Sequence, residues 1–171
     1  LASSWKPIGG SEAGYADRRR RVDTVATKML EEAARRHHLT LNTLVQGAWA
    51  VLLNRYTSEN DVLFGATISG RPTELEGVES AIGLFINTVP VRVGIDDNQS
   101  VVDWLGGIQR EQRNRETHGF SRLLELQSFT GVPSGVPLFE SLIVFENYPI
   151  SIDAVLERDT AGLKLVERDG F

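Results

Sequence analysis

The sequence predicts an α/β fold, a layered sheet with flanking helices, because helical and strand patterns alternate along the chain. Two helical patterns precede the first short apolar run, and a third helical pattern follows the second apolar run. The length of 171 residues suits one domain that buries its own core. Residues 1–14, rich in Gly, Ser and Pro, are interpreted as a linker or cut edge, which leaves 15–171 as the domain.

An extended segment over 15–23 leads into a first helix, which Asp23 or Thr24 caps and which ends near residue 38. Four consecutive arginines at 18–21 are expected to lie solvated on that extended segment. The apolar residues expected on one face of the helix are Val25, Met29, Leu30 and Ala33. Thr40 caps a second helix over 41–56, whose apolar residues occupy more than one stripe, so we expect it to be buried on most sides.

Short apolar runs at 62–68 and 84–93 predict two strands joined by a polar loop over 69–80. Because Pro90 cannot donate to a β-ladder, it is expected at an edge, a bulge or an unpaired position. Ser100 begins a third helix, and the Gly- and Pro-rich stretch 120–137 is expected to be irregular. A buried strand over 142–145 and a last strand near 163–166 complete the predicted elements.

Composition excludes several classes of function. The net charge of -5 and the pI near 5.2 argue against general binding to nucleic acid or to anionic membranes. The chain has no cysteine and only three histidines, so we expect neither a disulfide framework nor a metal site. No apolar run reaches the length of a transmembrane helix and no signal peptide opens the chain, which predicts a cytoplasmic location.

The pair His37-His38 has the letters of an acyltransferase motif, in which two histidines precede three residues and then Asp-Gly. Here Asn42 and Thr43 stand where Asp and Gly would be. The pair follows two arginines at the predicted end of a helix, where cations complement the carbonyl end of the helix dipole. A surface helix terminus is therefore the favoured interpretation over a catalytic base.

Three segments in order carry a specific resemblance: "TLNTLVQGAWAVLLNRYTSENDVLFGATISGRP" at 40–72, "IGLFINTVPVRV" at 82–93 and "PLFESLIVFENYP" at 137–149. Together they resemble the C-terminal half of the condensation domains of nonribosomal peptide synthetases. The second segment resembles the family signature "IGxFxNTxxxR", carried by Ile82, Gly83, Phe85, Asn87, Thr88 and Arg92. The similarity extends from about residue 15 to residue 149.

The resemblance implies one lobe of a two-lobed fold like that of chloramphenicol acetyltransferase. It implies an acyltransferase of antibiotic and other secondary metabolism, which joins aminoacyl or peptidyl thioesters held on carrier proteins. The implied partners are the N-terminal lobe and the donor and acceptor peptidyl carrier proteins, with phosphopantetheine arriving on the carriers and no cofactor bound directly. In the family the His-His-x-x-x-Asp-Gly motif lies upstream in the N-terminal lobe, so no catalytic residue and no activity are expected of this lobe alone.

The strand 84–93 and the loop 69–79 are the expected wall of the substrate tunnel or of the lobe seam. An amide in an apolar strand requires a partner, so Asn87 is expected to bind either a pantetheine amide or a loop, and both interpretations stay open. The remaining candidates for the tunnel or the seam are Thr88, Phe85, Gly83, Arg92, Gly70 and Arg71. Of these, the two arginines are expected to hold loops or the seam more than substrate.

Two other functions remain open. One is an epimerization or cyclization domain of the same superfamily, and the other is a non-catalytic module that docks a carrier protein. Many condensation domains follow the third helix with "HQDxPFE", whereas this chain has "HGFSRLL" at 118–124, which leaves open whether the donor residue is L or D. Because a lobe is built to pack against a second one, the isolated chain is also expected to expose apolar surface and to self-associate.

Overall fold

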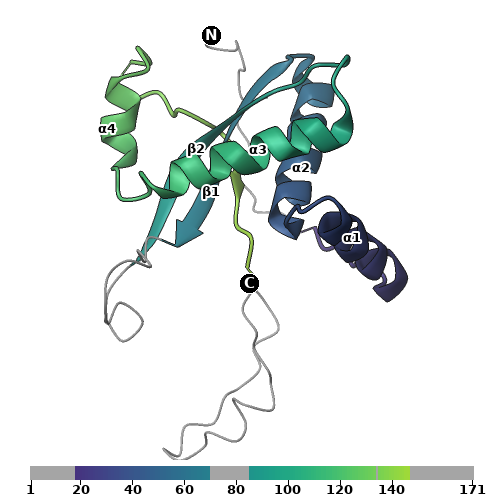
Figure 1. The fold of residues 1–171 in the computed structure, drawn as a ribbon. Helices are drawn as coiled ribbons and strands as arrows, with labels where there is room; N and C mark the ends of the chain where they lie inside the picture. The colour runs from purple at the N-terminus through teal and green to yellow at the C-terminus, as the bar shows by residue number, and fades with distance from the viewer. Residues whose placement is uncertain (1–17, 70–84, 134, 147–171) are drawn as a thin grey trace, which may run out of the picture.

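Three strands form one mixed sheet, with helices packed on one of its faces (Figure 1). This computed structural model describes residues 18–69, 85–133 and 135–146. The described elements are α1 (Thr24–Arg36), α2 (Leu41–Thr57), β1 (Asp61–Ser69), β2 (Ile86–Gly94), α3 (Val101–Glu116), α4 (Leu123–Ser128) and β3 (Leu142–Ile143). The predicted α/β class is confirmed. Among the described residues, no helix combines the length and apolar character that crossing a bilayer requires.

The three long helices begin where their capping residues predict. Asp23, Thr40 and Ser100 each accept a hydrogen bond from the backbone N–H three residues later, at 2.8, 3.1 and 3.2 Å. Each satisfies an N–H that has no acceptor within its helix, which fixes the start of that helix. Asp23 rather than Thr24 is the cap of α1, and α1 ends at Arg36, two residues before the expected end.

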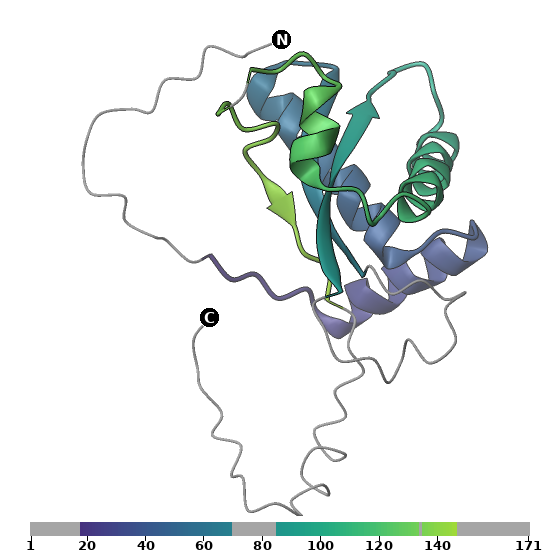
Figure 2. The same ribbon diagram turned by 90° about the vertical axis from the view of Figure 1, so that its left-hand side faces the viewer.

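β1 is the central strand of the described sheet. It pairs antiparallel with β2, from Asp61 opposite Gly94 to Ser69 opposite Ile86. It pairs parallel with β3, and Figure 2 shows this short strand in yellow-green beside the two longer strands. The order β2-β1-β3 makes β2 an edge of the described sheet, and this position accommodates Pro90 without losing a ladder donor. The expectation for that proline is confirmed.

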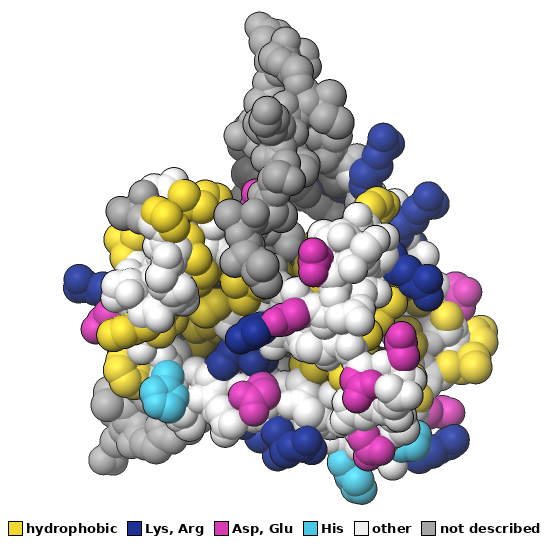
Figure 3. Space-filling model, turned by 90° about the horizontal axis from the view of Figure 1, so that it is seen from above, with side chains coloured by type: hydrophobic (Ala, Val, Ile, Leu, Met, Phe, Trp, Pro, Cys, Tyr) yellow, Lys and Arg dark blue, Asp and Glu magenta, His cyan; other side chains and the backbone are white. Residues whose placement is uncertain are grey.

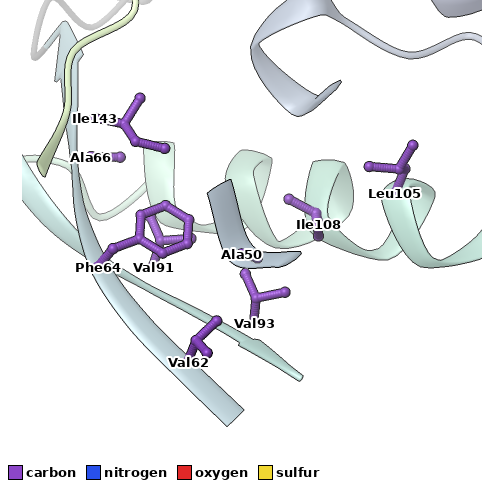
Figure 4. Packing of buried hydrophobic residues seen from close by; sticks show 9 residues of the cluster. All are labelled: Ala50, Val62, Phe64, Ala66, Val91, Val93, Leu105, Ile108 and Ile143. Atoms are coloured by element: carbon purple, nitrogen blue, oxygen red, sulfur yellow. The ribbon is translucent and has the colours of Figure 1, made fainter. Parts of the chain in front are cut away.

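The core lies between one face of the sheet and the helices α2 and α3. Figure 4 shows Ala50 of α2 and Leu105 and Ile108 of α3 beside the buried side chains of the strands. The strand residues of this cluster are Val62, Phe64, Ala66, Val91, Val93 and Ile143. In β1 and β2 every second residue joins the cluster, because successive side chains of a strand point to opposite faces.

Helix α2 differs from its prediction. Its buried residues are small or polar, namely Thr43, Gln46, Gly47 and Ala50, whereas Val45, Val51 and Leu52 are 40–42% exposed. A Cβ at Gly47 would collide with Leu105 Cδ2, so the missing side chain allows α3 to approach closely. The expectation of burial on most sides was therefore wrong for the described residues, because close helix contact selects small residues on one side only.

In helix α1, too, the apolar residues that were expected to be buried are exposed, and a small residue is buried instead. The expected apolar face of Val25, Met29 and Leu30 is exposed, and Ala34 is the buried residue of the helix. The four arginines at 18–21 are exposed as expected, but residues 18–23 have no regular secondary structure. Residues 18–23 therefore form no strand of the described sheet, and residues 15–17 of the expected extended segment lie outside the described residues.

Two further expectations differ from the structure, and three lie outside the described residues. The stretch 120–137, expected to be irregular, contains α4, whose N-cap Arg122 makes no side-chain capping bond. This absence removes a main signal by which sequence reveals a helix start. The buried strand expected over 142–145 is confirmed only for Leu142–Ile143, and of these two residues Ile143 is buried whereas Leu142 is 50% exposed. The expected linker at 1–14, most of the loop at 69–80 and the strand near 163–166 lie outside the described residues.

Candidate functional site

Asn87 is held by three hydrogen bonds near the start of β2. Its Nδ2 donates to the carbonyl oxygens of Gly119 at 2.6 Å and Ser121 at 2.9 Å, and its Oδ1 accepts from the Thr88 N–H at 2.9 Å. Both hydrogens of the amide are therefore used within the chain. These contacts are those of a side chain that fixes a loop, and they join β2 to the turn between α3 and α4.

The turn that Asn87 holds is tightly packed against the sheet. Gly119 is buried, and a Cβ there would lie 2.5 Å from Ile68 Cδ1 and 3.2 Å from the carbonyl oxygen of Glu116. In the register of β1 and β2, Ile68 stands directly opposite Asn87, so both residues meet the turn from the helix side of the sheet. Sequence reasoning missed Gly119, although a glycine after a polar helical run is a signal for a helix end.

This geometry predicts different effects for two substitutions at one position. Asn87→Ala removes the donors of two carbonyls, and we expect a loss of about 1–3 kcal/mol in the free energy of unfolding. Asn87→Asp keeps the shape but directs a carboxylate at the same two carbonyl oxygens, so it should destabilise further at neutral pH. Urea denaturation of both variants measures the difference. Equal stability of the aspartate variant and the native chain would contradict the contact.

The other candidate residues are spread over the same region. Thr88 is half-buried and stands opposite Thr67 on the sheet face that points away from the helix core. Phe85 is half-buried and directly precedes β2. Gly70, Arg71 and Gly83 lie outside the described residues. Of the described candidates, Asn87 and Thr88 are neighbours in the chain but lie on opposite faces of the sheet, so the structure does not bring them into one site.

Arg92 makes a surface ion pair across the two strands. Its Nε lies 2.9 and 3.0 Å from the two carboxylate oxygens of Asp61, and its Nη2 contacts the same carboxylate. The hydrogen bond from the guanidinium lowers the pKa of Asp61 below its usual range. Both side chains are well exposed, so the pair contributes little to stability. Its position joins the start of β1 to the end of β2, whereas the sequence predicts that Arg92 holds a loop or the lobe seam.

The two adjacent histidines lie on the surface. His37 ends α1 as its C-cap, His38 has a φ of 56°, and both side chains are exposed. Thr40 then caps α2, so this stretch is the end of one helix and the cap of the next, as the sequence predicts. No group of His, Cys, Asp and Glu in the described ranges could hold a metal ion.

A buried polar network, which sequence reasoning missed, holds this turn to α3. Gln109 Oε1 accepts from the Thr40 N–H at 2.8 Å and from Thr43 Oγ1 at 3.0 Å. Gln109 Nε2 donates to the carbonyl oxygen of His38 at 2.8 Å. The turn containing the histidines is thus fixed by a residue about 70 positions later, which is why local sequence gives no sign of it.

The chain matches one protein family over most of its length. A family model described as the condensation domain matches residues 12–168. The chain is 51% identical over 129 residues to a linear gramicidin synthase protein of Brevibacillus parabrevis, covering 75% of the chain and 2% of that protein. It is 38% identical over 141 residues to surfactin synthase subunit 3 of Bacillus subtilis, covering 82% and 11%. The chain therefore spans only a small fraction of the curated relatives it matches.

Solved structures show the same fold. The first condensation domain of the calcium-dependent antibiotic synthetase, in complex with a substrate analogue, matches with a TM-score of 0.56 at 19% identity, over 69% of this chain and 25% of that one. A four-domain nonribosomal peptide synthetase bound to AMP and glycine matches with a TM-score of 0.69 at 23% identity, over 78% and 10%. At these identities the likeness establishes the chloramphenicol-acetyltransferase-like fold of the described elements.

Proposed function

Because this chain belongs to the condensation domain family of nonribosomal peptide synthetases, we propose that it is the C-terminal lobe of such a domain. In this proposal residues 15–171 form the lobe, and the lobe helps to join two thioesters held on carrier proteins into a peptide. The observation that carries the proposal is the family match over residues 12–168, in a chain whose histidine pair ends a surface helix. The proposal includes the cytoplasmic location that the sequence predicts.

Exposed apolar side chains around α4 support the proposal that a second lobe packs against this one. Phe120, Leu124 and Phe129 are 80–83% exposed, and Figure 3 shows hydrophobic side chains gathered on the side of the molecule where α4 lies. Large apolar groups that gather on a surface usually mark a contact with another protein surface. The partner in this proposal is the N-terminal lobe of the same domain, which supplies the catalytic histidine.

The reaction depends mainly on how the amine and the thioester are positioned. The amine of the acceptor attacks the thioester carbon of the donor, the new amide bond forms, and the thiol of the donor arm leaves with a proton. Holding the amine and the thioester together supplies much of the acceleration, and a base on the opposite lobe takes the proton of the amine. The contribution of this lobe is a rigid wall, formed by β2 and by the turn that Asn87 holds.

In this proposal the tunnel wall or lobe seam includes Phe85, Asn87 and Thr88, together with Gly70, Arg71, Gly83 and Arg92. The phosphopantetheine arms belong to the carrier proteins, so the lobe itself holds no cofactor. Since both amide hydrogens of Asn87 bind backbone carbonyls, its contribution is to hold the wall in place.

A complementation assay tests the function. The chain is mixed with the N-terminal lobe encoded directly upstream and with loaded donor and acceptor carrier proteins, and the acceptor carrier is analysed by mass spectrometry. We expect a peptide only when both lobes are present, and none when the first lobe carries an alanine at its motif histidine. Turnover by this chain alone, or its loss in the His38→Ala variant, would overturn the proposal.

The same assay separates the alternatives. An epimerised or cyclised product would identify an epimerization or cyclization domain. Carrier binding without any product, together with an upstream frame that lacks the His-His-x-x-x-Asp-Gly motif, would identify a docking module.

The isolated chain should also self-associate through the apolar surface around α4. We expect light scattering to show dimers or larger species, and the double variant Leu124→Glu, Phe129→Ser to be mostly monomeric. Val101→Ser is the matched control, because Val101 is 68% exposed but lies in the first turn of α3. A native chain that stays strictly monomeric would contradict the proposed seam.

A further inference from the structure

Asn87 fixes the backbone on both sides of Phe120. Its Nδ2 donates to the carbonyl oxygens of Gly119, at 2.6 Å, and Ser121, at 2.9 Å, which are the residues directly before and after Phe120 in the chain. The amide is itself held, because its Oδ1 accepts from the Thr88 N–H at 2.9 Å. Phe120 is nevertheless 83% exposed. Its ring therefore projects to the surface from a segment whose backbone is bonded to the sheet.

Further contacts make this segment rigid. The Gly119 N–H donates to the carbonyl oxygen of Glu116 at 3.1 Å, and the Ser121 N–H donates to that of His118 at 3.0 Å. With its backbone fixed both from the sheet and from within the turn, Phe120 has only its side-chain torsions left to order when a partner covers it. An aromatic group that is held in this way loses little conformational entropy on binding.

Phe129 provides a contrast within the same apolar surface. It is 80% exposed at the C-cap of α4, and its N–H donates to the carbonyl oxygen of Leu126 at 3.2 Å. This bond stays within one helical turn, whereas the bonds from Asn87 to the flanks of Phe120 cross 32 and 34 positions. Two aromatic rings of similar exposure thus differ in how firmly the chain holds them.

The character of this surface indicates a lasting partner. Phe120, Leu124 and Phe129 are 80–83% exposed, and the charged side chains between them, Arg122 and Glu125, have opposite signs. Apolar area rather than net charge therefore dominates recognition, which is typical of permanent contacts, whereas transient partners meet more polar surfaces. The fold match covers 25% of the chain of the solved condensation domain, so most of such a domain lies outside the matched part and is available to cover this surface.

We propose that Phe120 is the anchor by which this lobe binds the N-terminal lobe, and that Asn87 is a positioning residue for this anchor. The inference rests on the proposed function, since it takes the N-terminal lobe as the partner. The site that fits the anchor is an apolar recess on the other lobe that admits one aromatic ring. Because Asn87 lies in β2, the same amide joins the proposed tunnel wall to the contact between the lobes.

Surface plasmon resonance with the N-terminal lobe immobilised tests the anchor, at concentrations of the 171-residue chain below those at which it self-associates. We expect Phe120→Ala to weaken binding about thirtyfold, the loss typical of a hot-spot residue, and Phe120→Leu to recover most of it. Phe129→Ala should cost at least threefold less than Phe120→Ala. Tyr56→Ala is the matched control, because Tyr56 is an aromatic residue of α2 that is 82% exposed, and it should leave binding unchanged.

The outcomes separate this inference from the proposed function. Equal affinity of Phe120→Ala and the native chain would overturn the anchor and leave the proposed function intact. No binding of the native chain to the N-terminal lobe would overturn both. If Phe120→Ala abolishes self-association in light scattering while its binding to the lobe is unchanged, the ring serves a contact between copies of this chain and the inference is wrong.

A double-mutant cycle tests whether Asn87 acts through Phe120. Asn87→Ala should weaken lobe binding about tenfold in the native chain, but less than about twofold when residue 120 is already alanine. A merely structural role of Asn87 would lower the affinity by the same factor in both backgrounds, and that result would overturn the positioning role. Circular dichroism checks that all four chains are folded. If Asn87→Ala does not fold, Asn87→Ser, which keeps one donor, takes its place in the cycle.

Discussion

Phe64→Ala should lower the free energy of unfolding of this chain by about 3–5 kcal/mol, the range for truncating a buried phenylalanine. Phe64 is fully buried in β1, the central strand, and stands opposite Val91 of β2. It belongs to the cluster that joins the sheet to Ala50 of α2 and Ile108 of α3. Because these backbones are held by ladders and caps, they can close only part of the cavity that the truncation leaves.

Urea denaturation followed by circular dichroism measures this effect. Met29→Ala is the matched control, since Met29 is 65% exposed and belongs to α1 rather than to the apolar surface around α4, and we expect it to change stability by less than about 0.5 kcal/mol. If the alanine variant does not fold, Phe64→Leu should still show a loss of about 1 kcal/mol, because it removes less volume. A tolerated Phe64→Ala would show that the core does not depend on this strand.

Gln109→Leu should destabilise the chain by about 2–4 kcal/mol although leucine is similar in size and apolar. The substitution leaves the Thr40 N–H and the His38 carbonyl without their partner, and it removes one of the two hydrogen bonds of the Thr43 hydroxyl, which keeps its contact with Thr40 Oγ1 at 2.8 Å. Thr43 is fully buried, so water cannot replace the bond to its hydroxyl without opening the contact between α2 and α3. An unsatisfied buried polar group costs about 1–3 kcal/mol. The Thr40 N–H and the His38 carbonyl, which lose their partner altogether, are only partly buried.

Gln112→Leu on the same helix is the control for this prediction. Gln112 Nε2 donates to the exposed Glu116 at 3.1 Å, and Gln112 Oε1 accepts a long bond of 3.5 Å from Gln46 Nε2, which also donates to Asn42. We therefore expect less than about 1 kcal/mol of change. The double variant Thr43→Val, Gln109→Leu should be more stable than the sum of the single effects predicts, because it removes both partners of one buried bond. Strict additivity would show that the two side chains do not interact.

The sequence predicted best what depends on neighbouring residues. The caps Asp23, Thr40 and Ser100 were found because each signal lies within three residues of the group it satisfies. The two long strands were found because their apolar runs are short and bounded by turns. The prediction that Pro90 lies at an edge, a bulge or an unpaired position was right, because a missing N–H excludes a fully paired central position whatever the partner is.

What the sequence could not predict depends on distant partners. Asn87 was recognised as an amide that needs a partner, but Gly119 and Ser121 follow more than 30 positions later. The polar side of α2 buries against α3 because Gln109 and Gly47 fit there, and apolar periodicity carries no sign of such a contact. The sequence also could not predict that Arg115 Nη2 is buried without a partner among the described residues, since its burial depends on how β2, α3 and α4 pack around it.

The family resemblance located the strand signature but not the use of each side chain. It drew attention to Arg92 and Asn87, and the structure then shows a surface ion pair for the first and a loop anchor for the second. Family signatures preserve residue types at positions, whereas contacts depend on the chain that surrounds them.

The parallel pairing of β3 with β1 has a consequence for anyone who recombines synthetases by exchanging gene segments. A crossover point placed in the connection after α4 would take Leu142 and Ile143 from one parent and their ladder partners Gly65 and Ala66 from another. The folding of chimeras joined there would depend on whether the residues of the two parents fit each other in the ladder between β1 and β3. Joints outside the span from β1 to β3 would keep this ladder within one parent.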